Sequence, residues 1–224
     1  MKHGKKYVAA KAMVEKGKIY DVAEAVSLAK KASYSKFWWS LDINIKTVAD
    51  PKYNDQAIRG TVVLPHGTGK TVSVAAFVSD DKLEDAKAAG ATIVGNVDLI
   101  RSIEAGTINF DVLVTTPDMI KDLAKVAKIL WPKGMMPTPK TGTITTDLKS
   151  TIEEIQKGRI EFKLDKTGNI HAGVGKLSFD DAKLVDNINA VLNAVEALKP
   201  VVIKNKLFKR VTIAPTMGPG IQIG

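Results

Sequence analysis

The sequence predicts an α/β protein of two domains: the two ends of the chain form an α+β domain with an antiparallel sheet, and the middle forms an inserted α/β domain. One observation behind this prediction is that the spacing of hydrophobic residues in the middle of the chain differs from that in the two flanks. The other is charge. Between Gly67 and Gly158 there are 11 basic and 12 acidic residues, net −1, whereas the two flanks have 22 and 12, net +10. At 224 residues and 45% hydrophobic composition, the chain can bury two cores.

The N-terminal flank is predicted to contain a helix and a strand. Asp21 is a typical N-cap, and the apolar residues after it recur at helical spacing. From Ser40 to Thr47 apolar and polar residues alternate, which predicts a strand with one buried face. The inner residues of this strand are Leu41, Ile43 and Ile45, and the outer residues are Asp42, Asn44 and Lys46. One face of the sheet is therefore expected to be polar.

The C-terminal flank is predicted to add a hairpin, a helix and another strand. The hairpin consists of Arg159–Leu164, a turn at Asp165–Gly168, and Asn169–Val174. An amphipathic helix is predicted from about Asp180 to Leu198, because apolar residues recur at helical spacing and a proline follows. The last predicted strand is Phe208–Ile213.

The middle of the chain alternates short apolar segments with helical patterns. The predicted strands are Val72–Val78, Ala91–Gly95 and Phe110–Thr115, and the predicted helices are Lys82–Ala89, Val97–Ala105 and Asp118–Leu130. Such alternation is typical of a parallel sheet covered by helices. We therefore predict one domain from residues 1–67 and 159–224, with residues 68–158 inserted. The Pro- and Gly-rich segment Trp131–Thr143 is expected to be irregular.

Composition disfavours several classes of site. The chain has no cysteine, and His3, His66 and His171 are scattered, so we expect no bound metal. Glu153 and Glu154 point about 100° apart on a predicted helix, which does not suit a catalytic pair. No apolar run approaches the roughly 18 residues of a membrane span, and the start lacks the pattern of a secretory signal. A soluble, cytoplasmic protein without a membrane partner is expected.

Gly67-Thr68-Gly69-Lys70-Thr71 matches the end of the phosphate-binding loop of nucleotide hydrolases. The complete motif requires a glycine where this chain has Leu64, and a helix where the sequence predicts a strand. A nucleotide-handling enzyme that uses the middle domain is therefore an alternative, which a nucleotide-binding assay on the isolated middle would test. A protein-interaction module is a third.

The basic flanks predict an acidic partner, most commonly nucleic acid. Lys36-Phe37-Trp38-Trp39 places aromatic rings beside a cation, as in surfaces that stack on bases, although core packing of the tryptophans fits equally well. His66 or His171 can contact a phosphate or a structural carbonyl. Further cations on or beside the flank strands are Lys163, Lys166, Lys176, Lys204, Lys206, Lys209 and Arg210. Their position on the domain whose sheet has a polar face favours RNA as the partner.

Four stretches carry a resemblance over essentially the whole chain. They are Arg59–Gly67, Gly134–Thr143, Gly158–Lys163 with Asp165–Gly168, and Thr216–Pro219. In this order they resemble the bacterial ribosomal protein L1 family, large-subunit proteins of the mobile stalk beside the transfer RNA exit site. The resemblance implies a discontinuous domain that binds large-subunit ribosomal RNA and a Rossmann-like, three-layer inserted domain. It also implies a monomer when free, with no enzyme activity and no cofactor.

For function, the resemblance further implies assistance in moving deacylated transfer RNA out of the exit site, and repression of the chain's own operon messenger RNA. Thr216, Met217 and Gly218 would make the closest RNA contact. The chain departs from the family pattern at Trp38, Trp39, Arg210 and Ala214-Pro215. The predicted RNA-binding residues are Lys36, Phe37, Ser40, Lys163, Asp165, Lys166, Thr167, His171, Arg210, Thr216, Met217 and Gly218.

Overall fold

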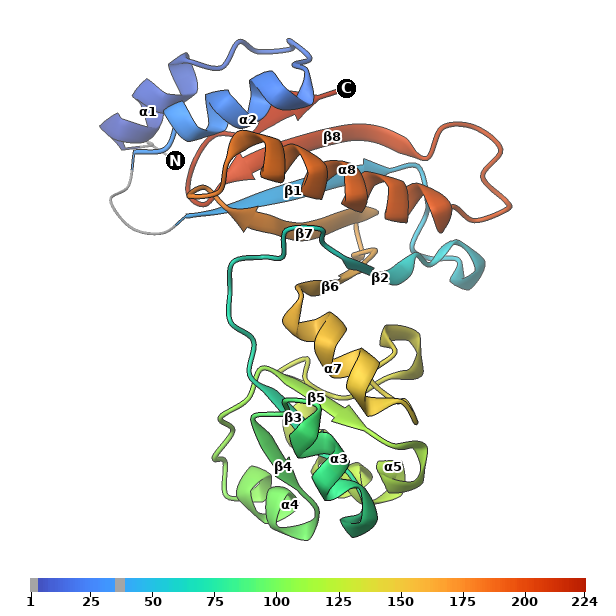
Figure 1. Cartoon of the computed structure of the whole chain (residues 1–224). Coiled ribbons are helices and arrows are strands. Elements are labelled where there is room, and N and C mark those ends of the chain that lie inside the picture. The colour runs from blue at the N-terminus through green and yellow to red at the C-terminus, as the bar shows by residue number, and fades with distance from the viewer. Residues whose placement is uncertain (1–3, 35–38) are drawn as a thin grey trace. The chain divides into compact units, whose positions relative to one another are not determined.

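The computed structural model describes residues 4–34 and 39–224. The chain divides into two compact units (Figure 1). The first, here called the terminal unit, consists of Met1–Gly69 and Gly158–Gly224, and the second, the middle unit, consists of Lys70–Lys157. Both α-helices and β-strands occur in each unit. The predicted mixed α/β class with antiparallel and parallel sheets is confirmed.

An antiparallel sheet with strand order β7-β1-β8-β9 forms the terminal unit. Three of its strands lie where the sequence predicts them: β1 (Ser40–Thr47), β7 (Asn169–Lys176) and β8 (Phe208–Pro215). The short edge strand β9 (Ile221–Ile223) was not predicted. Because β1 pairs with both β7 and β8, its side chains stand in the middle of the sheet.

One face of this sheet is buried under two helices, α2 (Val22–Lys31) and α8 (Asp181–Ala197), which lie on the same side of it in Figure 1. Both helices were predicted, and the Asp21 side chain caps α2 by accepting a hydrogen bond from the Ala23 amide. The inner side chains of β1 are fully buried, as its alternation predicts. A shorter helix, α1 (Lys5–Ala12), precedes them.

The predicted hairpin across the Asp165 turn is wrong in its pairing. Strand β6 (Arg159–Lys163) pairs with β2 (Arg59–Val63) in a separate two-stranded sheet, and a single bridge between Leu164 and Ile170 joins it to β7. Phe162 is fully buried in the same core as β1, so β6 and β2 extend that core. Alternation in β6 correctly indicated a strand but could not specify its partner.

A three-stranded parallel sheet of order β4-β3-β5 forms the middle unit, from β3 (Val74–Phe77), β4 (Ile93–Gly95) and β5 (Val112–Thr115). Alternate residues of β3 enter two different cores. Helices α3 (Leu83–Ala88) and α7 (Leu148–Gln156) contribute to one core. The other core contains residues of α4 (Val97–Glu104), α5 (Ile120–Leu123) and α6 (Ala127–Leu130). Helices thus cover both faces of the sheet.

The single helix predicted over Asp118–Leu130 is interrupted. The 3-10 turn η3 (Pro117–Met119) precedes α5, and the 3-10 turn η4 (Ala124–Val126) separates α5 from α6. Leu123 and Val126, three residues apart, are both fully buried, and a 3-10 turn places side chains at this spacing above one another. Three further 3-10 turns among the described residues are η1 (Asn54–Gln56), η2 (Asp80–Lys82) and η5 (Pro139–Thr141), the last inside the segment predicted to be irregular.

Within the terminal unit, the two chain segments that border the middle unit lie against each other. A Cβ atom on Gly158 would lie 2.5 Å from the Gly67 Cα, and Gly158 has φ 103°, so glycine is required there for both space and conformation. Asn187 of α8 binds the first of these two segments. Its fully buried amide donates to the Gly67 and Val174 carbonyls and accepts from the His66 amide, at 3.0, 2.8 and 3.2 Å.

Replacing Asn187 by Leu should destabilise the protein by about 3 kcal/mol, because one amide and two carbonyl groups of the backbone then lose their partner in a buried place. Asn189→Leu on the exposed side of the same helix is the matched control and should change stability little. Urea unfolding measures both. Equal stabilities for the two variants would show that the hydrogen bonds of Asn187 to the His66, Gly67 and Val174 backbone do not stabilise the protein.

Candidate nucleic-acid interface

The second face of the four-stranded sheet is lined by polar and small side chains. Inward residues of each strand belong to the core, so by alternation the residues between them face the opposite side. This polar face carries Asp42, Asn44, Lys46, Asn169, His171, Arg210, Thr212 and Gln222. These side chains are partly or fully exposed, as expected for a face on which a ligand can be bound.

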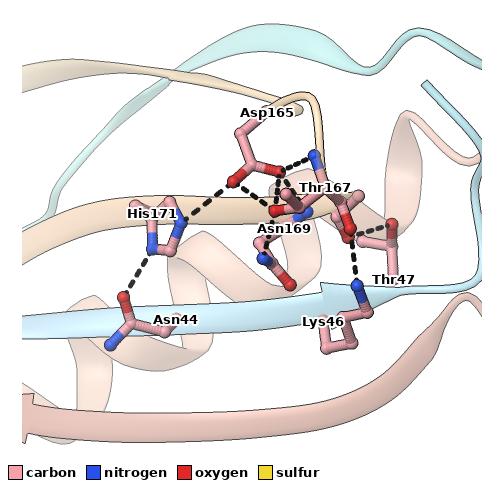
Figure 2. A network of polar contacts seen from close by, with 8 residues as sticks. Asn44, Lys46, Thr47, Asp165, Thr167, Asn169 and His171 are labelled. Atoms are coloured by element: carbon pink, nitrogen blue, oxygen red, sulfur yellow. Dashed lines mark hydrogen bonds and ion pairs between the residues drawn. The ribbon is translucent and has the colours of Figure 1, made fainter. Parts of the chain in front are cut away.

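One end of the polar face is formed by the turn that precedes β7 (Figure 2). The Asp165 carboxylate accepts hydrogen bonds from the Asn169 amide at 2.7 Å, the Thr167 hydroxyl at 2.7 Å and the Thr167 amide at 2.9 Å. These bonds favour the charged carboxylate and hold the pKa of Asp165 well below its usual value, and the bond from the Asn169 amide has the largest effect. The turn therefore keeps a fixed negative group and a fixed shape.

Strand β1 connects this turn to the centre of the sheet. The His171 ring lies between Asn44 Oδ1, 2.6 Å from Nδ1, and Asp165 Oδ2, 3.5 Å from Nε2 (Figure 2). Lys46 donates to the Thr167 carbonyl at 2.5 Å, and the Thr47 hydroxyl donates to the Gly168 carbonyl at 3.0 Å. Contacts at both ring nitrogens fix the orientation of the imidazole.

A basic hollow lies beside the turn, with a volume of about 590 Å³. Its cations are Lys46, Lys52, Lys166 and Lys209. Lys166 is exposed and comes from the turn itself, whereas Lys46 and Lys209 come from β1 and β8. Four ammonium groups around one hollow favour the binding of phosphate groups.

A second turn, directly after β8, forms the opposite end of the interface. The Thr216 hydroxyl donates to the Ser40 carbonyl at 3.1 Å and accepts from the Ser40 amide at 3.2 Å. Met217 has φ 64°, and its side chain is 73% exposed. Its carbonyl accepts from the Tyr34 hydroxyl at 2.8 Å, and the Gly218 amide donates to the Pro215 carbonyl at 2.8 Å. An exposed apolar side chain is thus held outward by a hydrogen-bonded turn.

The model of the ribosomal protein L1p/L10e family matches residues 28–219. The chain belongs to this family. It is therefore a protein of the large ribosomal subunit that binds ribosomal RNA, and the family is structural rather than enzymatic. The match includes three of the four strands of the terminal sheet, β1, β7 and β8, and both turns at the ends of the polar face. In the described residues of this L1-family chain, no helix is long and apolar enough to cross a membrane.

The structure of the L1-family chain around Lys70 does not favour the alternative of a nucleotide-binding phosphate loop. Strand β3 is the first element after Lys70-Thr71, as predicted, so the helix that the complete motif requires does not directly follow this loop. Lys70 donates to Asp111 Oδ1 at 2.7 Å. This hydrogen bond, with that of the Ser73 amide, lowers the pKa of Asp111. The lysine that would bind a nucleotide phosphate thus faces a carboxylate of its own unit.

The predicted RNA-binding residues of the terminal unit lie in distinct places. Asp165, Thr167 and His171 form one hydrogen-bonded network, and Lys166 lines the adjacent hollow. Ser40, Thr216, Met217 and Gly218 meet at the second turn. Arg210 stands directly opposite Lys46 on the neighbouring strand. Lys163 is exposed on β6, outside both networks. Lys36 and Phe37 lie outside the described residues, as does Trp38.

Several residues of the interface were not predicted as site residues. Asn44 and Lys46 were assigned to the outer face of β1, and that alternation was a signal that could have included them. Asn169 and Tyr34 gave no such signal, because their partners are far away in the sequence or set by the turn. Trp39 is buried, 3% exposed, and packs edge-on against Tyr34 at 5.3 Å, so core packing is its role.

Asp165→Asn should destabilise the protein at pH 7 by about 1 kcal/mol, a value reduced for screening because the side chain is 35% exposed. The pKa of Asp165 is lower in the folded than in the unfolded chain. The stability that the charged Asp165 carboxylate contributes is therefore fully present above its unfolded pKa of about 3.9, and it is lost as the pH falls below that value toward the folded pKa. The difference from wild type should thus shrink below about pH 4.

Urea unfolding between pH 7 and pH 3 measures this difference. Asp55→Asn, an exposed carboxylate on a short 3-10 turn, is the control. A difference for Asp165→Asn that stays constant down to pH 3 would contradict the assigned charge.

Proposed function

We propose that the polar face of the terminal sheet, with the Asp165 turn and the Thr216–Gly218 turn at its ends, is the surface on which this chain binds ribosomal RNA. The observation that carries the proposal is the one-sided burial of the sheet. Two helices cover one face, whereas the other presents cations, hydrogen-bonding groups and two ordered turns. The charge of the chain supports the same location, since the terminal unit carries the net +10 and the middle unit is nearly neutral.

The groups on this surface suit RNA more than DNA. Turn backbone and hydroxyl groups, such as Thr216 and Thr167, can contact ribose 2′-hydroxyls, which DNA lacks. The lysines of the basic hollow provide the part of the affinity that depends on phosphate and salt. Recognition would therefore combine RNA shape at the two turns with charge between them.

We further propose the finer role that family membership suggests. The bound RNA is the mobile stalk of the large subunit, the chain assists release of deacylated transfer RNA from the exit site, and it represses its own operon messenger. The messenger would bind the same surface, because a repressor of this kind needs an RNA that imitates the ribosomal site. We also propose that the two compact units act as domains, with RNA binding in the terminal one.

Two variants of the second turn test the surface. Thr216→Val removes both hydrogen bonds of the side-chain hydroxyl to Ser40, and Gly218→Val places a Cβ atom 2.4 Å from Pro215 Cγ, so each displaces the turn. Affinity for the stalk ribosomal RNA fragment should fall about 5- to 150-fold, equivalent to about 1–3 kcal/mol. Calorimetric titration measures it.

Thr146→Val, an exposed hydroxyl of the middle unit, is the control and should bind like wild type. The same titration against the leader of the operon messenger should show parallel losses if one surface serves both RNAs. Unchanged affinity for the ribosomal fragment in folded Thr216→Val and Gly218→Val proteins would remove the turn from the RNA-binding surface.

Deletion of residues 70–157 tests the division of labour between the units. A short Gly-Ser linker can join Gly69 to Gly158, because the bordering segments already touch at Gly67 and Gly158. The shortened protein should unfold cooperatively and bind the ribosomal fragment within a few-fold of the full chain. A folded product with only nonspecific affinity would show that the middle unit is required for recognition.

A further inference from the structure

Beside the second turn, the terminal unit has a cleft of about 230 Å³, and among the described residues predicted to bind RNA only Arg210 lines it. One wall is α1 with the loop after it, from Tyr7 to Lys18, and the floor is the polar face of β8 and β9. Pro219 and Gly220, which directly follow the Thr216–Gly218 turn, form the rim. The cleft is therefore continuous with the proposed RNA-binding surface.

Cations dominate the lining of this cleft. Lys11, Lys16, Lys18 and Arg210 line it, against one acidic residue, Glu15. Lys18 is 3.9 Å from Glu15 and lies over the Tyr20 ring, so that carboxylate is already associated with a cation. Among the described residues, Lys11, Lys16 and Arg210 have no side-chain hydrogen bond or ion pair. The cleft thus has a surplus of positive charge without a partner in its own unit.

Arg210 is placed where the fold alone disfavours it. It stands directly opposite Lys46 on the neighbouring strand, and like charges in such cross-strand pairs are destabilising. Lys46 has the Thr167 carbonyl as its partner, whereas Arg210 is exposed and lines the cleft. An anion in the cleft would remove this repulsion.

We propose that the cleft between α1 and strands β8 and β9 is a second phosphate-binding subsite for the same RNA, with Arg210 at its centre. This inference rests on the proposed RNA-binding surface, since it takes the RNA strand on the Thr216–Gly218 turn to continue past Pro219 and Gly220. A guanidinium can hold two oxygens of one phosphate, and Lys11 and Lys16 neutralise neighbouring phosphates. The Thr212 and Gln222 side chains on the floor offer hydrogen bonds to ribose.

A backbone phosphate suits the cleft better than a free small anion. The cations are exposed, long side chains at the edge of an open hollow, and such groups gain affinity mainly when several phosphates bind at once and release counterions. The site therefore adds strength and salt dependence to RNA binding and leaves its sequence preference to the turns.

The test measures binding of the stalk ribosomal RNA fragment by the full chain over a series of salt concentrations. Arg210→Gln should reduce the slope of log affinity against log salt by about 0.7–0.9, and the double variant Lys11→Gln, Lys16→Gln by about twice that. Lys183→Gln is the matched control, because it loses one charge on α8, the helix that covers the other face. The control should keep the wild-type slope, and all variants should keep the wild-type preference over a scrambled RNA.

Phosphate-ethylation interference gives the second readout. Some of the modified phosphates that block binding of the wild type, those bound in the cleft, should no longer do so for Arg210→Gln, whereas the others should still block it. Slopes and interference patterns equal to those of Lys183→Gln would overturn the subsite. Competition by inorganic phosphate at constant ionic strength, seen for wild type and lost in Arg210→Gln, would instead assign a small-anion site and overturn the RNA assignment. Failure of the proposed surface is distinguishable, because Thr216→Val and Gly218→Val would then bind the ribosomal fragment like wild type.

Discussion

The alternation of side chains along β1 is the constraint on which the rest of the terminal unit depends. Leu41, Ile43 and Ile45 are fully buried under α2 and α8, which fixes the register of the strand, since a shift by one residue would expose all three. The same alternation places Asn44 and Lys46 on the other face, beside His171 and Arg210. Core packing thus determines which polar groups an RNA can meet, and in which order.

The two turns are ordered by hydrogen bonds within the protein. Asp165 binds two amides and a hydroxyl, and the Thr216 hydroxyl is engaged with both backbone groups of Ser40. Binding groups held in place before the ligand arrives lose less conformational entropy on association. The consequence for Thr216 is that its hydroxyl shapes the turn, and only its remaining acceptor capacity is left for the proposed RNA contact.

Local patterns in the sequence predicted most of the elements. Period-two alternation identified β1 and β8, and helical spacing after Asp21 and toward Pro200 identified α2 and α8. What could not be predicted depends on pairing between distant segments. Nothing local says that β6 joins β2, or that the His171 ring lies between Asn44 and Asp165.

The candidate site follows the same division. Resemblance to a family placed residues at the two turns, but the cleft beside α1 involves residues from both ends of the chain and becomes visible only when they are brought together. The break between α5 and α6 is a further case, because burial of Leu123 and Val126 overrides a helical pattern that looks continuous in sequence.

The most direct test of the central claim is lysine acetylation of the free protein and of its complex with the stalk ribosomal RNA fragment, followed by mass spectrometry. RNA bound to the polar face should protect Lys46, Lys166 and Lys209. Lys183 on α8 and Lys121 of the middle unit should react equally in both states. Protection of Lys183 with unchanged reactivity of Lys46, Lys166 and Lys209 would place the RNA on the helical side of the sheet and contradict the account.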